Sequence, residues 1–218
     1  YPLRVACCRA CRLVQIADDL PSDRLFREDY VYQSSISSQF VDHARKHAES
    51  LIKDYKLKTP KHVVEIASND GYLLQYYREK GIPVLGIEPA TNIAEIAVQS
   101  NIPTLNTFFT SKEAQRLATE GKHADIVHAH NVMPHVANQR DFAEGISTIL
   151  KPNGVAIIEF AYAIDTIDGT EFDQIYHEHM CYFSLTSFAR LCVQFGLHVI
   201  RVEKIAMHGG SLRVFLSH

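Results

Sequence analysis

The chain has 218 residues, of which 46% are hydrophobic and 22% charged, and its 22 Lys and Arg against 25 Asp and Glu give a net charge of −3. A disordered chain is poorer in apolar residues and a nucleic-acid-binding domain carries a basic excess, so we expect a folded protein without a nucleic-acid partner. No apolar run approaches the roughly 20 residues that span a bilayer, and no signal peptide opens the sequence, so we also expect no membrane association.

The first 60 residues are predicted to carry one helix. Apolar residues recur at three- and four-residue steps over 40–55, which is the spacing of an amphipathic helix. The polar stretch 18–37 before it is predicted to be largely irregular. We treat residues 1–20 as a small N-terminal module and residues 21–60 as a helical linking segment on the substrate side.

Residues 61–218 alternate between strand-like and helix-like patterns. Strands are predicted at 62–67, 84–88, 103–109, 125–130 and 155–161, and helices at 72–80, 92–99, 111–120, 139–150 and 185–195. This alternation predicts βαβ units, and therefore a parallel sheet with helices on both faces. The stretch 164–182 is predicted to be a long loop.

Two further strands, 198–205 and 211–216, end the chain, and only five residues link them. Because parallel strands need a crossover of a dozen or more residues, this last pair is predicted to be antiparallel. Five parallel strands followed by an antiparallel hairpin is the arrangement of class I S-adenosylmethionine (SAM) methyltransferases. The predicted fold class is therefore α/β, a Rossmann-like doubly wound sheet of that kind. Because the chain starts at Tyr1 and ends on an apolar strand, we expect a piece of a longer protein.

The loop after the first strand of this sheet, Glu65 to Gly71, is a candidate cofactor site. Ligands of open α/β sheets bind at the carboxyl ends of the strands, and small residues let the backbone approach a ligand. Glu88 ends the second strand, near the offset of about 20 residues at which an acid accepts both ribose hydroxyls. The polar run His128–Asn131 ends the fourth strand at the same edge. Together these features favour an adenosine-type cofactor without distinguishing SAM from NAD, and an ordinary strand–helix turn with a solvent-facing Glu88 stays open.

The run Tyr176-His177-Glu178-His179 is a candidate active-site cluster in the segment where such a sheet exposes functional groups. A His-x-His pair beside a Glu is compatible with a general base and its orienting carboxylate, with a metal site, or with a purely structural role. His135, which follows the fourth strand, either reaches the same mouth or is an ordinary surface residue.

Cys8 and Cys11 have the spacing of half a zinc site. A structural zinc needs four ligands, so either a second pair lies upstream or the spacing is a coincidence. Five cysteines, three of them at 7, 8 and 11, do not form the pattern of a secreted disulfide framework, and we expect a soluble cytoplasmic protein. Cys181 and Cys192 lie in apolar patterns and are predicted to be core thiols.

Several motifs occur together in this sequence. They are Leu13-Val14-Gln15 after the Cys pair, Tyr30 with Ser34-Ser35, Val64-Glu65-Ile66-Ala67-Ser68-Asn69-Asp70-Gly71-Tyr72-Leu73-Leu74, Gly86-Ile87-Glu88-Pro89-Ala90, Asn131-Val132 with His135-Val136, Tyr176-His177-Glu178-His179 with Tyr182-Phe183-Ser184, and His208-Gly209-Gly210-Ser211-Leu212-Arg213. In this combination the chain resembles the bacterial sugar C-methyltransferases that act on nucleotide-linked keto-deoxysugars, and the resemblance covers nearly the whole chain.

The resemblance implies a zinc module, a SAM-binding sheet over residues 61–218, and a C-terminal domain that helps to hold the sugar nucleotide. The first zinc knuckle and the C-terminal domain do not occur in these 218 residues. The implied cofactors are SAM and a structural zinc held in part by Cys8 and Cys11. The implied SAM contacts are Glu65, Ala67, Ser68, Asn69, Gly71, Glu88, Pro89 and Asn131.

By the same resemblance, His179 is the general base, and Tyr176, Glu178, His135 and Tyr30 surround the sugar. A ketone acidifies the neighbouring C–H bond, so a base can create the carbon nucleophile that attacks the SAM methyl group. We therefore expect a SAM-dependent C-methyltransferase of a nucleotide-linked keto-deoxysugar, acting as a monomer or weak dimer. The alternatives are O- or N-methylation of a small molecule, or SAM binding without turnover.

Overall fold

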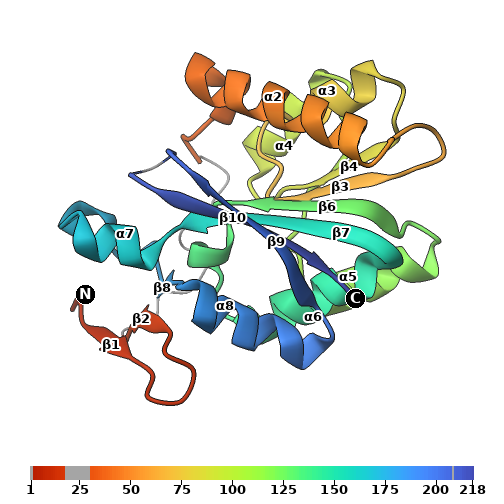
Figure 1. The fold of residues 1–218 in the computed structure, drawn as a ribbon. Coiled ribbons are helices and arrows are strands. Elements are labelled where there is room, and N and C mark those ends of the chain that lie inside the picture. Colours follow the sequence, from red (N-terminus) through yellow and green to blue (C-terminus); the bar gives the residue numbers. More distant parts are fainter. Residues whose placement is uncertain (1, 18–29, 208) are drawn as a thin grey trace.

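The computed structural model describes residues 2–17, 30–207 and 209–218. Figure 1 shows a large twisted sheet with helices on both faces and a small antiparallel sheet near the N-terminus. The predictions that fall on residues 18–29 and on His208 lie outside the described residues. No helix in the described part of the chain combines the length and the apolar character needed to cross a membrane.

The large sheet has the strand order β5-β4-β3-β6-β7-β10-β9. Its members are β3 (Val63–Ile66), β4 (Val84–Ile87), β5 (Thr104–Leu105), β6 (Ala124–His130), β7 (Leu150–Ala161), β9 (His198–Ile205) and β10 (Ser211–Ser217). The first five pair in parallel, and β10 runs antiparallel to both β7 and β9. The order reverses beside β3, which is the position where such sheets bind ligands. The predicted mixed sheet of the class I SAM-methyltransferase type is confirmed.

Three helices lie on each face of this sheet (Figure 1). One face carries α2 (Ser38–Asp54), α3 (Leu74–Glu79) and α4 (Thr91–Gln99), and the other carries α5 (Ser111–Thr119), α6 (Gln139–Ile149) and α8 (Leu185–Cys192). Two apolar clusters, one on each face, bury the sheet. The helix α2 matches the predicted 40–55 pattern, because its buried side chains recur at three- and four-residue steps and include Phe40, Ala44, Ala48 and Leu51. Short 3-10 helices lie in the connections between these elements, at η1 (Ser34–Ile36), η2 (Met133–His135), η3 (Phe172–Gln174) and η4 (Val193–Phe195).

The segment 164–182 is not a simple loop, which corrects the prediction. It contains α7 (Ala163–Asp168), η3 and the short strand β8 (Cys181–Tyr182). The strand β8 pairs antiparallel with β2 (Val14–Ile16), and β2 pairs with β1 (Val5–Cys7). A pairing between residues so far apart in sequence leaves no local periodicity, so the pattern over 164–182 alone did not show it.

Strand β7 also starts earlier than predicted. The predicted helix 139–150 ends at Ile149, and Leu150 already pairs with Ala124 on β6. The register shifts between Ala124 and Ile126, so the first part of β7, which contains Pro152 and Gly154, forms an irregular entry to the strand. Proline and glycine therefore mark a bulged strand start here rather than a connecting loop.

Gly86 in β4 leaves room for the loop that follows β3. A Cβ atom at position 86 would lie 2.4 Å from the Ser68 Oγ atom and 3.0 Å from the Thr104 Oγ1 atom. Overpacking of a close-packed core typically costs about 1–3 kcal/mol, so we expect Gly86→Ala to lower the free energy of unfolding by about that amount in urea denaturation. Because Ser68 is the nearest neighbour, adding Ser68→Ala should restore part of the loss. A Gly86→Ala protein as stable as the wild type would contradict this account of the loop.

Candidate active site

A cavity of about 850 Å³ opens at the carboxyl ends of the parallel strands. Most of the predicted site residues line it, namely Tyr30, Ala67, Asn69, Glu88, Pro89, Asn131, His135, Tyr176, Glu178 and His179. Glu65, Ser68 and Gly71 are buried behind this lining and do not take part in it. The structure therefore brings the predicted cofactor loop and the predicted catalytic cluster to one cavity, although they lie about a hundred residues apart in sequence.

The turns at the ends of β3 and β6 hold an uncommon backbone conformation. Ala67, Asn69 and Asn131 have φ values of 55°, 49° and 53°. A non-glycine residue in this left-handed region costs on the order of 1–3 kcal/mol, and such residues cluster at ligand sites. Gly71 has a φ of 82°, and a Cβ atom there would lie 2.8 Å from Ile102 Cγ1, so only glycine closes this turn without strain.

Glu88 links the two halves of the cofactor edge. Its carboxylate is 4% exposed; Oε2 accepts a hydrogen bond of 2.9 Å from the Asn69 amide, and Oε1 accepts one of 2.9 Å from the Ala90 amide. Burial raises the pKa of Glu88, and the two amide hydrogen bonds oppose that rise. Each carboxylate oxygen has a second lone pair, so Glu88 can shape the loop and still accept hydroxyl groups from the cavity.

Two further acids, Glu65 and Asp70, lie behind the cofactor loop with unsatisfied oxygens. Both carboxylate oxygens of Glu65 and the Oδ1 atom of Asp70 are buried without a hydrogen-bond partner among the described residues. Burial raises the pKa of Glu65 well above its usual value, and the neighbouring Asp70 and Glu88 raise it further. Neither acid lines the cavity, and Asp70 Oδ2 accepts a hydrogen bond of 3.1 Å from the Ser35 amide, so these acids support the cofactor loop from behind.

The segment before η1 is tied down onto the cofactor loop. The Oδ1 atom of Asn69 accepts a hydrogen bond of 2.8 Å from the Ser34 amide, and its Nδ2 atom donates one of 3.2 Å to the Tyr32 carbonyl. Asn92 Nδ2 donates a hydrogen bond of 2.8 Å to the Tyr30 carbonyl. These contacts place the Tyr30 side chain at the cavity, where the motif resemblance expected it.

His179 has a defined tautomer. Its Nδ1 atom lies 3.0 Å from the Gln174 carbonyl oxygen, and its Nε2 atom lies 2.8 Å from the Tyr176 hydroxyl. A carbonyl oxygen only accepts hydrogen bonds, so Nδ1 carries the proton and Nε2 is the basic nitrogen. The basic nitrogen therefore faces the hydroxyl of Tyr176, which is 39% exposed. This arrangement provides a neutral imidazole base beside a phenol.

His135 repeats the same tautomer next to it. Its Nδ1 atom lies 2.9 Å from the Glu178 carbonyl oxygen, and the ring centroids of His135 and His179 lie 4.9 Å apart. Burial, followed by the charge of a protonated His179, lowers the pKa of His135 to about 4. His135 is therefore neutral near pH 7 and is a second potential proton acceptor in the cavity.

The two tyrosines at the cavity stay protonated. Burial, together with Glu178 and Glu88, raises the pKa of Tyr30 to about 12, and burial, followed by Glu178, raises the pKa of Tyr176. A protonated phenol donates a hydrogen bond. Tyr30 and Tyr176 are therefore suited to stabilise a negatively charged oxygen.

The Cys-bearing hairpin β1–β2 supports the segment that carries His179. The Ile16 amide donates a hydrogen bond of 2.9 Å to the Met180 carbonyl, directly after His179. Cys8 and Cys11 lie in the turn of this hairpin, and backbone hydrogen bonds from Cys11 and Ala10 lower the pKa of the Cys8 thiol. No third His, Cys, Asp or Glu ligand gathers with these two thiols among residues 2–17, 30–207 and 209–218. Cys8 and Cys11 alone offer two of the four ligands that a structural zinc needs, and metal binding by this pair stays a prediction.

One wall of the cavity was not predicted from the sequence. Phe108, Phe109 and Phe142 line it together with Asn138 and Asp141 at the start of α6. Asn138 accepts a hydrogen bond from the Asp141 amide, and Asp141 in turn accepts hydrogen bonds from Ser111. The Asn-x-x-Asp spacing is a helix N-cap signal, and it would have placed a helix start at this edge of the sheet.

The strand order, the ligand site beside β3 and the acidic residue after β4 define a class I SAM-dependent methyltransferase. A family model described as a methyltransferase domain matches residues 40–202, and the chain belongs to that family. C-methyltransferase NovU from Streptomyces niveus is 33% identical over 215 residues, which are 99% of this chain and 51% of that protein. The chain thus spans about half the length of this relative.

Two solved structures show the same fold at low sequence identity. The PH0226 protein from Pyrococcus horikoshii OT3 has a TM-score of 0.67 and 16% identity, covering 85% of this chain and 94% of its own. Magnesium protoporphyrin IX methyltransferase (ChlM) from Synechocystis PCC 6803, with bound SAH, has a TM-score of 0.60 and 16% identity, covering 81% of this chain and 82% of its own. These structures show that the chain shares the fold of these proteins over more than four fifths of its length.

Glu88 provides a direct test of the cofactor placement. Loss of a hydrogen bond to a charged group costs about 1.5–3 kcal/mol, so we expect Glu88→Ala to weaken SAM binding by about 10- to 150-fold in calorimetric titration. The exposed Glu95 on α4 is a matched control, and Glu95→Ala should leave the affinity unchanged. Equal SAM affinity in Glu88→Ala and the wild type would refute the placement.

Proposed function

We propose that this methyltransferase deprotonates a nucleotide-linked keto-deoxysugar next to its ketone and methylates the resulting carbon nucleophile. The observation that carries the proposal is the Nε2 atom of His179, a neutral imidazole acceptor held 2.8 Å from the Tyr176 hydroxyl at the cavity. Methylation of carbon needs a base of this kind, because a C–H bond must first lose its proton. The similarity to a C-methyltransferase supports the same reaction class.

The residues of the chain divide the proton chemistry between them. The substrate C–H proton passes to His179 Nε2, and the electron pair of that bond moves onto the ketone oxygen as an enolate. The hydrogen bond from Nδ1 to the Gln174 carbonyl favours the imidazolium that forms. Tyr30 donates a hydrogen bond toward the enolate oxygen. Tyr176 donates to His179 Nε2 in the structure; once Nε2 holds the substrate proton, it donates to the Tyr176 oxygen instead, and the Tyr176 hydroxyl turns its own proton toward the enolate. Bound SAM would supply the electrophilic methyl group, and the electron pair of the broken S–CH3 bond would stay on sulfur.

The size and lining of the cavity support two ligands in one chamber. Its volume of about 850 Å³ is near the upper end of the roughly 300–1,000 Å³ typical of small-molecule pockets. The cofactor edge at Ala67 and Glu88 and the base at His179 line the same space, so cofactor and sugar would meet without a further channel. Holding both reactants in one orientation contributes more to such a rate than the base alone.

The reaction class is tested by offering the natural full-length protein SAM and a panel of nucleotide-linked keto-deoxysugars. The mass of the expected product exceeds that of the substrate by one CH2 group. In NMR spectra the new methyl group should correlate with sugar carbons in a way that shows it is bonded to carbon. A methyl group on oxygen or nitrogen would assign the protein to O- or N-methylation. Specific SAM binding without any methylated product would favour a binding protein.

A further inference from the structure

The sheet face beneath helix α2 carries a row of buried polar side chains. The register pairs Glu65 on β3 with His128 on β6, His130 with Glu159 on β7, and Glu159 with Arg213 on β10. The side chains of His128, Glu159 and Arg213 are at most 9% exposed. Strands buried on both faces are normally apolar throughout, so a polar row across the middle of this sheet calls for a function.

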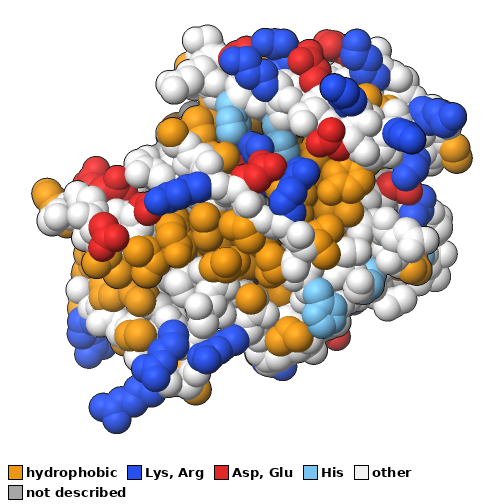
Figure 2. All heavy atoms as spheres, viewed as in Figure 1, with side chains coloured by type: hydrophobic (Ala, Val, Ile, Leu, Met, Phe, Trp, Pro, Cys, Tyr) orange, Lys and Arg blue, Asp and Glu red, His pale blue; other side chains and the backbone are white. Residues whose placement is uncertain are grey.

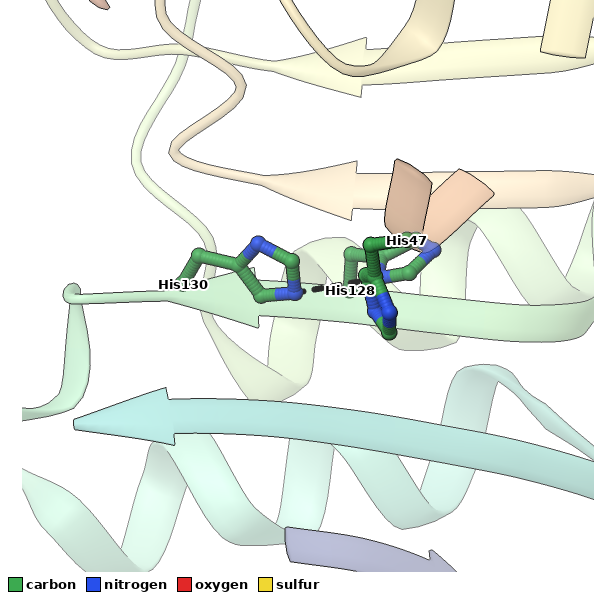
Figure 3. Close-up of side chains that lie close together, drawn as sticks. All are labelled: His47, His128 and His130. Atoms are coloured by element: carbon green, nitrogen blue, oxygen red, sulfur yellow. Dashed lines mark hydrogen bonds between the residues drawn. The ribbon is translucent and has the colours of Figure 1, made fainter. Parts of the chain in front are cut away.

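Three histidines of this region converge from two elements. His47 comes from α2, and His128 and His130 come from the same face of β6 (Figure 3). One ring nitrogen from each of the three lies within 4.8 Å of the others. His128 Nδ1 and His130 Nε2 are 3.1 Å apart and share a hydrogen bond. The cluster is separate from His135 and His179, which belong to the catalytic end of the cavity.

The third histidine has an unsatisfied nitrogen. His47 is only 5% exposed, and its Nε2 atom is buried without a hydrogen-bond partner among the described residues. A buried polar atom without a partner costs about 1–3 kcal/mol, so a neutral core gives no reason for a histidine at this position. A ligand that accepts the nitrogen lone pair would remove that cost.

The orientation of the His128 ring suits metal binding. Its Nδ1 atom faces His130 Nε2 at 3.1 Å, inside the cluster, and its other nitrogen is bonded outside the cluster. The Tyr77 hydroxyl lies 2.9 Å from His128 Nε2 and orients this ring, as an outer partner of a metal ligand does.

One carboxylate lies near the cluster. Glu159 Oε1 is 3.8 Å from His130 Nε2. Glu159 also pairs with Arg213, and Glu203 pairs with both Arg213 and Arg201, so the two carboxylates face two guanidiniums. These ion pairs are balanced in charge, so the histidine nitrogens rather than a surplus of negative charge would hold an ion.

A small cavity leads from the surface to this cluster. It has a volume of about 170 Å³ and is lined by His47 together with His43, Lys46, Ser50, Leu51, Arg201, Glu203 and Arg213. Figure 2 shows histidine, basic and acidic side chains gathered at the surface between α2 and the strands β9 and β10. An ion reaching His47 by this route would not pass through the catalytic cavity.

We propose that His47, His128 and His130 bind a divalent transition-metal ion of the zinc type, with water as the fourth ligand. Three imidazoles suit zinc, and tetrahedral bonds of about 2.0–2.1 Å require nitrogens roughly 3.3–3.4 Å apart. His128 Nδ1 and His130 Nε2, 3.1 Å apart, are already close to this spacing, and the His47 nitrogen lies within 4.8 Å of both. The ion fastens α2 to the central strand β6, and because His130 also lines the catalytic cavity, it fixes one wall of that cavity.

The test separates this site from the Cys8–Cys11 pair. Protein carrying Cys7→Ser, Cys8→Ser and Cys11→Ser is stripped with a chelator and titrated with Zn²⁺ by calorimetry and with Co²⁺ by absorption spectroscopy. We expect one equivalent of metal and tetrahedral Co²⁺ bands without thiolate charge-transfer absorption. At a 100-fold excess of free Zn²⁺ over Kd, the melting temperature should rise by about 5–10 °C.

Two variants and a control complete the test in the same background. His47→Gln and His128→Gln should each lose the Co²⁺ bands and the thermal shift while remaining folded by circular dichroism. His62→Gln changes a histidine at the far end of the sheet, beside β3, and should retain both signals. Absence of metal binding in the parent, or binding that survives both His variants, would overturn the proposal.

Discussion

Replacement of His179 by Gln is expected to lower the rate of methyl transfer by a factor of about 10² to 10⁴, the usual contribution of a general base. Gln retains polarity and approximate size but cannot accept the substrate proton at Nε2. SAM affinity should be unchanged, because the residues predicted to hold SAM lie at the ends of β3, β4 and β6 or in the turns after them and do not include His179. Single-turnover kinetics and calorimetric titration of the natural full-length protein measure the two effects separately.

His177 offers a matched control for this variant. It lies two residues from His179, but its Nε2 atom faces the Pro2 carbonyl at 3.1 Å and it does not line the cavity. His177→Gln should therefore transfer methyl groups at close to the wild-type rate. If His179→Gln also does so, another residue is the base, and His135, with the same tautomer 4.9 Å away, is the first to test.

Replacement of Arg213 by Met is expected to lower the free energy of unfolding by about 3–5 kcal/mol. Arg213 pairs with Glu159, which is 2% exposed and would be left as a buried charge without its guanidinium. For a chain of this length the melting temperature should fall by roughly 6–20 °C. Thermal and urea unfolding in the presence of a chelator measure the loss without any contribution from metal.

The double variant Glu159→Leu with Arg213→Met is the control. Replacing both members of a buried ion pair by apolar residues is often close to neutral, so the double variant should regain most of the stability lost in Arg213→Met. A double variant as unstable as the single one would mean that Arg213 stabilises the sheet through packing rather than through Glu159.

The same pair gives a pH dependence with a definite sign. Burial disfavours the charged form of Glu159, but His130, His43 and Arg213 outweigh it and hold the pKa of Glu159 well below its usual value. A depressed folded-state pKa contributes stability above the unfolded value of about 4.3, and this contribution is lost as the pH falls through the folded-state pKa. Wild-type stability should therefore decline in acid more steeply than that of Glu159→Gln.

Much of the fold was predictable from local patterns. Buried strands and amphipathic helices leave periodic apolar positions, as in α2, and the short link at 206–210 required an antiparallel pair at the end of the sheet. The position of Gly71 and Glu88 at one edge of the sheet was also predictable from the topology of such a sheet, and SAM binding at that edge stays a prediction. The candidate cluster at Tyr176–His179 was predicted from its residue types and its place after the fifth strand, and the role of each residue came from the motif resemblance.

The features that the sequence did not show depend on contacts between distant segments. Strand β8 forms because β2 supplies its partner, and a two-residue strand has no periodicity of its own. The His47 cluster joins a helix to a strand about eighty residues later, so no spacing motif marks it. His128 was predicted at the cofactor edge with Asn131, but its side chain is buried beneath α2, because alternate residues of β6 point to opposite faces.

The most direct test of carbon methylation is hydrogen exchange at the substrate. The natural full-length protein is incubated in deuterated water with the keto-sugar nucleotide and an unreactive SAM analogue, so that deprotonation occurs without methyl transfer. The account predicts that the wild type incorporates one deuterium beside the ketone and that His179→Gln does so at least about 100-fold more slowly. If the wild type methylates this substrate with SAM but incorporates no deuterium into it with the analogue, the proposed deprotonation is contradicted.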